Sequence, residues 1–155
     1  RRFGYAHAEE FDRMLALLVE ASAHYLALQA RAGAHALMLF ESWAEGLPED
    51  VFERWVIAPT TALIRRLRDL GVHLPVLGFP RGAGALSVGY AQRSGVDAIG
   101  LDTAIPLDWA AAALPSGMPV QGNLDPARLV AGDAGLEDRV RAIVETLKGR
   151  PHIFN

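Results

Sequence analysis

The chain has 155 residues, of which 51% are hydrophobic and 21% are charged, and its formal net charge is -3. This composition is that of an ordinary globular domain, long enough to bury one sizeable core. The negative charge argues against a nucleic-acid-binding surface, the lack of cysteine excludes a disulfide framework, and no apolar run approaches the roughly 20 residues that span a bilayer.

The first part of the chain predicts a long amphipathic helix followed by a buried strand. From 9 to 31, apolar side chains recur at three- and four-residue spacing, and Gly33 follows as a C-terminal stop. The apolar run 36–40 is too short for a helix of its own. It ends in the polar pair Glu41 and Ser42, which is typical of a strand buried on both faces.

The rest of the chain alternates between helix and strand. A helical stretch covers 49–70, and Pro59 should divide it, because proline lacks a backbone donor and favours the first turn of a helix. The sequence next predicts a strand at 74–79, a loop at 80–84 and a short helix to 94. It then predicts a strand at 96–101, a helix at 107–114, a strand at 120–123, a helix at 136–148 and a strand at 152–154. This alternation implies right-handed crossovers and a parallel sheet.

Two architectures fit these strands, an open doubly wound sheet and part of an eight-stranded barrel. The predicted strands end in polar residues, namely Glu41, Ser42, Arg81, Asp102, Thr103, Gln121, Asn123 and Asn155. In a barrel these side chains would meet at one rim, where the active sites of that fold are built. The residues therefore favour the barrel without excluding the open sheet.

Four segments, at 33–44, 75–79, 100–102 and 121–126, carry a resemblance to a known family. They include Phe-Glu-Ser at 40–42 and Gln-Gly-Asn-Leu-Asp-Pro at 121–126. In order and spacing the chain resembles uroporphyrinogen decarboxylase over essentially its whole length. The resemblance implies an α/β fold, a (β/α)8 TIM barrel, with 1–155 as the C-terminal half of a single catalytic domain that covers the fourth to eighth strands.

The ends of the chain suggest a piece of a larger protein. It starts at Arg1 without a methionine and stops at Asn155, within the last predicted strand. By the resemblance, most of the remainder precedes Arg1, and a Leu-Gly-His-Gly loop should follow Asn155.

The implied reaction removes carbon dioxide from the four acetate side chains of uroporphyrinogen III and gives coproporphyrinogen III in heme biosynthesis. No cofactor is expected, because the pyrrole ring can accept a proton and act as the electron sink while the enzyme stabilises the cationic ring. Family members use a carboxylate, an arginine pair, a tyrosine and a histidine for these roles, and none of those positions lies in this chain. We therefore expect no catalytic residue in 1–155 and no activity from it alone. The complete enzyme should be a cytoplasmic homodimer whose partner is uroporphyrinogen, with no nucleic acid and no membrane.

Two candidates for substrate binding follow from the resemblance. Ser42 matches a serine that hydrogen-bonds a substrate carboxylate, and Phe40 matches an aromatic residue that lines the cleft. Alternation along a strand puts Phe40 and Ser42 on one face and Glu41 on the other. The alternatives are that Ser42 bonds nearby backbone at a turn and that Phe40 is a core residue.

Arg81 is a third candidate, because a guanidinium in a glycine-rich loop at a strand end can pair with a carboxylate in a bidentate fork. It could equally be a solvent-facing loop residue. Asp102 and Asp125 are interpreted as polar support for loop geometry, since a substrate with eight carboxyls gains nothing from added negative charge.

Two other functions are alternatives to the decarboxylase. The same superfamily includes zinc-dependent methyltransferases that act on corrinoid or thiol cofactors, but the chain has no cysteine and no histidine pair with metal-binding spacing. We therefore expect no metal ligand, and we interpret His35 and His152, at the starts of strands, as structural. The other alternative is a non-catalytic half-barrel that serves as an interaction module.

Overall fold

The computed structural model describes residues 1–155, which form one five-stranded parallel sheet with helices between the strands. The strands are β1 (Leu37–Glu41), β2 (Val76–Pro80), β3 (Ala98–Gly100), β4 (Val120–Gln121) and β5 (His152–Ile153). They lie side by side in chain order, so that β1 and β5 are the two edges. The predicted α/β fold and its parallel sheet are confirmed.

The helices follow the predicted periodicity, with two additions. They are α1 (Arg2–Ala6), α2 (Ala8–Arg31), α3 (Glu49–Phe52), η1 (Glu53–Ile57), α4 (Ala58–Asp69), η2 (Gly84–Leu86), α5 (Ser87–Arg93), α6 (Leu107–Ala113), α7 (Pro126–Ala131) and α8 (Leu136–Thr146). The sequence did not predict α1 and α7, which have only 5 and 6 residues. None of the helices combines the length and apolarity needed to cross a membrane.

The predicted division of the helical stretch 49–70 is confirmed, and it takes the form of a π-helical turn. The turn η1 lies directly before α4, whose first turn contains Pro59. Proline has no N–H and so cannot form its helical hydrogen bond. A π-helical turn is a common way for a helix to accommodate a local interruption of its hydrogen bonds. The hydroxyls of Thr60 and Thr61 donate to the carbonyls of Val56 and Ile57 at 2.7 and 2.9 Å.

The register of the strands sorts their side chains into two faces. Leu39, Gly78, Ile99 and Val120 lie opposite one another across β1 to β4, and Ile99 and Val120 are fully buried. The next row is Phe40, Phe79, Gly100 and Gln121. Because successive side chains of a strand point to opposite faces, the first row faces the helices and the second faces away from them.

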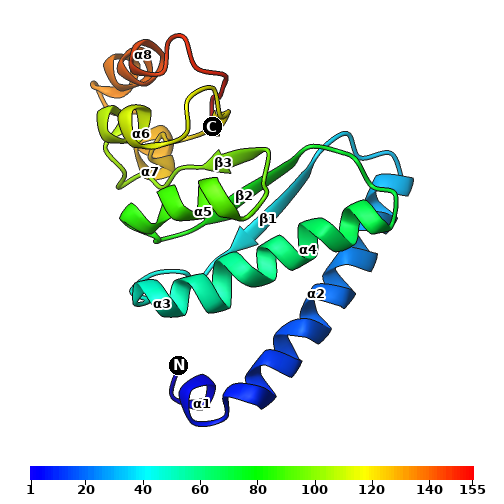
Figure 1. Ribbon diagram of the computed structural model, residues 1–155. Helices are drawn as coiled ribbons and strands as arrows, with labels where there is room; N and C mark the ends of the chain where they lie inside the picture. Colours follow the sequence, from blue (N-terminus) through cyan, green and yellow to red (C-terminus); the bar gives the residue numbers. More distant parts are fainter.

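The helices cover one face of the sheet in chain order. Figure 1 shows α2 and α4 side by side near β1, α5 beside β2, and α6, α7 and α8 gathered near the C-terminus. The N-terminal helices and the C-terminal helices lie at opposite ends of the molecule (Figure 1). One core of buried apolar residues runs through all these layers.

Candidate active site

Five of the polar residues predicted at the strand ends meet at one hollow, namely Arg81, Asp102, Thr103, Asn123 and Asn155, whereas Glu41, Ser42 and Gln121 do not line it. A hollow of about 330 Å³ lies at the carboxyl ends of β2 to β5 and is lined by Phe79, Arg81, Leu101, Asp102, Thr103, Asn123, Leu124, Asp125, Pro126 and Asn155. The carboxyl ends of parallel strands share one edge of a sheet, which brings these loops together. We call this hollow the rim site.

Phe40 lies on the face of the sheet that points away from the helices. It is 66% exposed, and its ring meets that of Phe79 edge to face, with centroids 6.1 Å apart and planes at 86°. With Gly100 and Gln121 the two rings line a smaller hollow of about 110 Å³ next to the rim site. Gly100 leaves room for Phe79, because a Cβ there would lie 2.8 Å from the ring. Phe40 is thus not part of the buried core of residues 1–155, and contact between Phe40 and a substrate stays a prediction.

Ser42 follows β1 directly and is exposed. The alternative role predicted for it, bonding the backbone of the turn, is taken instead by Glu41, whose Oε1 accepts the Trp43 N–H at 3.2 Å. The Ser42 hydroxyl has no hydrogen bond within the chain, and contact between Ser42 and a substrate stays a prediction.

The Arg81 loop is held by its backbone. The Arg81 N–H donates to the carbonyls of Glu41 at 3.0 Å and Phe79 at 3.1 Å. Gly82 has a φ of +77°, a conformation that favours glycine, and its N–H donates to Asp102 Oδ2 at 2.8 Å. The Arg81 side chain lines the rim site, is exposed and forms no ion pair.

The interpretation of Asp102 and Asp125 as support for loop geometry is confirmed. Asp102 accepts the Gly82 N–H, and Asp125 caps α7 by accepting the Ala127 N–H at 2.9 Å. A carboxylate at the N-cap, the residue just before a helix, fits the unpaired N–H groups of the first turn.

Asn123 has a role that the sequence did not reveal. It is 3% exposed, and its Nδ2 donates to the carbonyls of Asp102 at 2.8 Å and Ile105 at 2.9 Å. Its Oδ1 accepts a longer bond from Arg139 at 3.4 Å. Asn123 therefore joins the loops after β3 and β4. Its place in the Gln-Gly-Asn motif was a signal, but its partners lie 16 to 21 residues away in the sequence.

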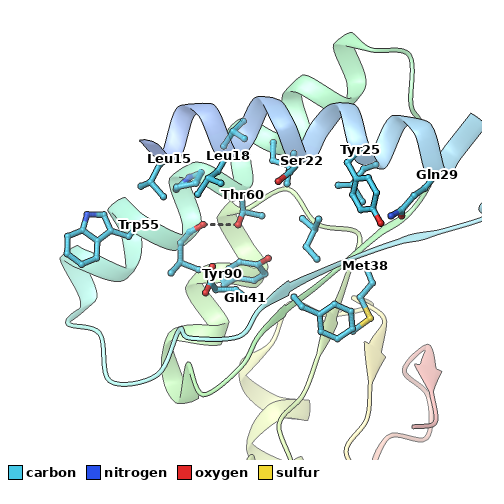
Figure 2. A pocket seen from close by; sticks show the side chains of 17 residues that line it. Leu15, Leu18, Ser22, Tyr25, Gln29, Met38, Glu41, Trp55, Thr60 and Tyr90 are labelled. Carbon is cyan, nitrogen blue, oxygen red and sulfur yellow. Dashed lines mark hydrogen bonds between the residues drawn. The ribbon is translucent and has the colours of Figure 1, made fainter. Parts of the chain in front are cut away.

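A larger hollow of about 430 Å³ lies on the helix side of the sheet, between α2, β1 and α4. Figure 2 shows Tyr90, Glu41 and Thr60 at one part of this hollow, with Tyr25 and Gln29 farther along α2. Burial raises the pKa of Tyr90 to about 12, the negative charge of Glu41 adds to this shift, and the Thr60 side chain partly offsets it. The Glu41 side chain thus faces the helices, opposite to Phe40, as strand alternation predicts.

The histidine and acidic side chains are not grouped as a metal centre would require. No group of three or more His, Asp or Glu side chains is placed to hold a metal ion. His152 is structural, as the sequence predicted, since its Nε2 donates to the Gly122 carbonyl at 2.6 Å. His35 is exposed at the start of β1.

Comparison with known proteins agrees with the resemblance in the motifs. The family model described as "Uroporphyrinogen decarboxylase (URO-D)" matches residues 1–155. The uroporphyrinogen decarboxylase of Maricaulis maris (strain MCS10) is 50% identical over 97% of this chain and 44% of that protein. That of Hyphomonas neptunium (strain ATCC 15444) is 49% identical over 99% of this chain and 45% of that protein. The chain spans less than half the length of these relatives. It belongs to the uroporphyrinogen decarboxylase family.

Proposed function

We propose that the complete protein is a uroporphyrinogen decarboxylase, a carboxy-lyase that converts uroporphyrinogen III to coproporphyrinogen III. The observation that carries this proposal is the similarity to proteins of that name, at 49% to 50% identity over nearly all of this chain. The same similarity supports a cytoplasmic homodimer, in line with the family.

The parallel sheet is, in this proposal, part of a (β/α)8 barrel. Three features support it: the strands lie in chain order, helices connect them, and both edges are free. An open doubly wound sheet reverses its strand order at a switch point, and this sheet does not. We infer that residues 1–155 are the C-terminal half of one catalytic domain and supply its fourth to eighth strands.

The rim site fits the anionic part of such a substrate. Uroporphyrinogen carries eight carboxylates, and Arg81 is the one cationic side chain among the residues that line the rim site. The two carboxylates there, Asp102 and Asp125, are each engaged by a backbone N–H group. We propose that Arg81 binds a substrate carboxylate at the rim site, that Ser42, which follows β1 outside this hollow, binds another, and that Phe40 packs against the macrocycle. An aromatic pair such as Phe40 and Phe79 offers an apolar wall to a pyrrole ring.

The chemistry needs no cofactor in this proposal. A proton adds to the pyrrole ring, the carbon–carboxylate bond breaks, and its electron pair flows into the cationic ring as carbon dioxide leaves. A second proton converts the resulting methylene to a methyl group when the ring loses its added proton. Groups that stabilise the cation contribute most to the rate, because they act where charge develops. We place those groups outside residues 1–155.

The test uses the full-length protein and uroporphyrinogen III, with EDTA present throughout. We expect coproporphyrinogen III to form at an undiminished rate in the chelator. Ser42→Ala should lower kcat/KM by roughly 10- to 100-fold, the effect of one hydrogen bond to a charged group worth about 1.5 to 3 kcal/mol. Ser116→Ala, at an exposed serine before β4, is the matched control.

Three results would contradict the proposal in different ways. A wild-type protein that leaves uroporphyrinogen unchanged would remove the decarboxylase function. Activity lost in EDTA and restored by zinc alone would favour the methyltransferase. Unchanged kinetics in Ser42→Ala would remove Ser42 from the site and leave the function intact.

A further inference from the structure

The main chain on both sides of Arg81 is held by neighbouring strand ends. The Arg81 N–H bonds to the Glu41 carbonyl at 3.0 Å, and the Gly82 N–H bonds to Asp102 Oδ2 at 2.8 Å. These two peptide groups flank the Arg81 Cα. The direction in which the Arg81 side chain leaves the backbone is therefore set by the Glu41 carbonyl and by the Asp102 carboxylate.

Gly82 further restricts the backbone path of this loop. Its φ of +77° is rarely adopted by other residues, and a Cβ there would lie 2.5 Å from the Glu45 Cβ. The loop after β1 thus packs directly on Gly82 and leaves no space for a side chain. Gly82 is held between that loop and Asp102.

The charges of Arg81 and Asp102 do not neutralise each other. Both side chains line the rim site, yet no ion pair joins them. The Asp102 carboxylate is engaged by the Gly82 amide, and the Arg81 guanidinium keeps its donors. A bidentate Arg–Asp pair would occupy the same fork that a carboxylate ligand needs.

Asp102 is itself fixed from the next strand. The buried Asn123 donates to the Asp102 carbonyl at 2.8 Å and to the Ile105 carbonyl at 2.9 Å. Because the backbone of Asp102 is held in this way, its carboxylate can fix the orientation of the loop that contains Gly82. The chain of contacts runs from Asn123 through Asp102 and Gly82 to Arg81.

We propose that Asp102 is a positioning residue that aims Arg81 at a carboxylate of the substrate. Asp102 acts through the Gly82 amide and not through contact with the substrate, which its negative charge would repel. The inference rests on the proposed function, because uroporphyrinogen supplies the carboxylate.

The test compares variants of the full-length protein by KM and kcat for uroporphyrinogen III. Asp102→Asn keeps a side-chain oxygen that can accept the Gly82 N–H, whereas Asp102→Leu has a similar size without an acceptor. We expect Asp102→Leu and Arg81→Gln each to raise KM by roughly tenfold, with kcat changed much less. Asp102→Asn should stay within about twofold of wild type, since the acceptor is retained.

The double variant Arg81→Gln/Asp102→Leu tests whether Asp102 acts through Arg81. If it does, the double variant has the KM of Arg81→Gln alone, because residues that act as a unit are not additive. A purely structural role would lower Tm and multiply the two effects. Asp108→Asn, at an exposed carboxylate in the first turn of α6, is the control and should leave KM unchanged.

Several outcomes would overturn the proposal for Asp102 while the function stands. They are multiplicative effects in the double variant, an unchanged KM in Arg81→Gln or Asp102→Leu, and an Asp102→Asn variant as impaired as Asp102→Leu. If Asp102→Leu does not fold, Asp102→Ala takes its place in the cycle, since it removes the acceptor without a bulky apolar group. A wild-type protein without activity on uroporphyrinogen would instead overturn the proposed function, and the Asp102 proposal with it.

Discussion

At the scale of single residues, Tyr90 and Gly78 show how one side chain depends on a distant one. Tyr90 of α5 is 1% exposed and lies over Gly78 of β2. A Cβ on Gly78 would come within 2.5 Å of the Tyr90 ring and of its hydroxyl. Gly78 is thus required by packing and not by a turn, and it lets α5 approach the sheet closely.

The buried phenol of Tyr90 predicts a loss of stability at high pH. Its pKa is raised from 10.0 to about 12, so the folded protein keeps a proton that the unfolded chain releases. The corresponding stability is fully present below pH 10 and is lost as the pH rises through 12, by about 1 kcal/mol at pH 11. In the full-length protein, Tyr90→Phe should therefore lose less stability than wild type between pH 8 and pH 11 in urea unfolding.

The control for this measurement is Tyr25→Phe, which removes an exposed phenol on α2. It should keep the wild-type dependence on pH. If Tyr90→Phe and wild type lose equal stability over this range, burial of Tyr90 does not contribute to the pH dependence.

The sequence predicted some residue roles and missed others for a common reason. The supporting roles of Asp102 and Asp125 followed from charge and position, and both are confirmed. The burial of Tyr90 and the bridging role of Asn123 depend on partners far along the chain, which a single sequence does not reveal. Substrate contacts of Phe40, Ser42 and Arg81 remain predictions.

At the scale of elements, Arg150 stabilises the end of α6. Its guanidinium donates to the carbonyl oxygens of Ala111 at 3.1 Å, Leu114 at 3.5 Å, Pro115 at 3.0 Å and Met118 at 3.0 Å. The last carbonyls of a helix have no partner within it, and a cation is favourable there. Arg150, just before β5, therefore connects the last strand to α6 and to the start of β4.

We expect Arg150→Met in the full-length protein to lower the free energy of unfolding by roughly 2 to 4 kcal/mol. The substitution leaves several partly buried carbonyls without a donor, and each carries a desolvation cost. Arg141→Met is the matched control, because Arg141 pairs only with the exposed Glu137 one turn away on α8. Its effect should be at most about 0.5 kcal/mol. Equal urea midpoints for the two variants would show that the Arg150 bonds contribute little.

The elements that the sequence predicted are the long and strongly patterned ones. The helix α2 has 24 residues with regular apolar spacing, and its bounds were predicted within one residue. By contrast α1 has 5 residues, and its Gly4 packs against the ring of Trp55, 2.6 Å from where a Cβ would lie. A helix of one turn formed by such a distant contact has no local signal. For α7 the sequence does carry a local signal, because Asp125 followed by Pro126 is typical of the start of a helix.

At the scale of the whole molecule, β1 offers a free backbone edge. The Leu37 N–H donates to the Pro75 carbonyl, and the Glu41 carbonyl accepts the Arg81 N–H, so both groups point toward β2. Along a parallel strand, the backbone N–H and C=O groups of alternate residues point to opposite neighbours. The N–H and C=O groups of Met38 and Phe40 therefore point to the outer edge. The alternation of strands and helices predicted the parallel sheet, but it did not determine whether the sheet belongs to a barrel, because an eight-stranded barrel needs three strands more than these five.

Residues 1–155, produced alone, should form oligomers or aggregate and should not decarboxylate uroporphyrinogen. The edges of β1 and β5 are unpaired, and Phe40 and Trp43 are 66% and 78% exposed. Open edges beside apolar surface favour pairing between copies, whereas a closed barrel has no edge. Sedimentation should therefore show species larger than a 16.7 kDa monomer, and adding the segments of a related decarboxylase that this chain does not span should reduce them. Met38→Lys should also reduce these oligomers, because an inward-pointing charge on an edge strand disfavours pairing with another edge. A soluble monomer that unfolds cooperatively in calorimetry would contradict this expectation, and coproporphyrinogen formed by that monomer would show that catalytic groups lie within these residues.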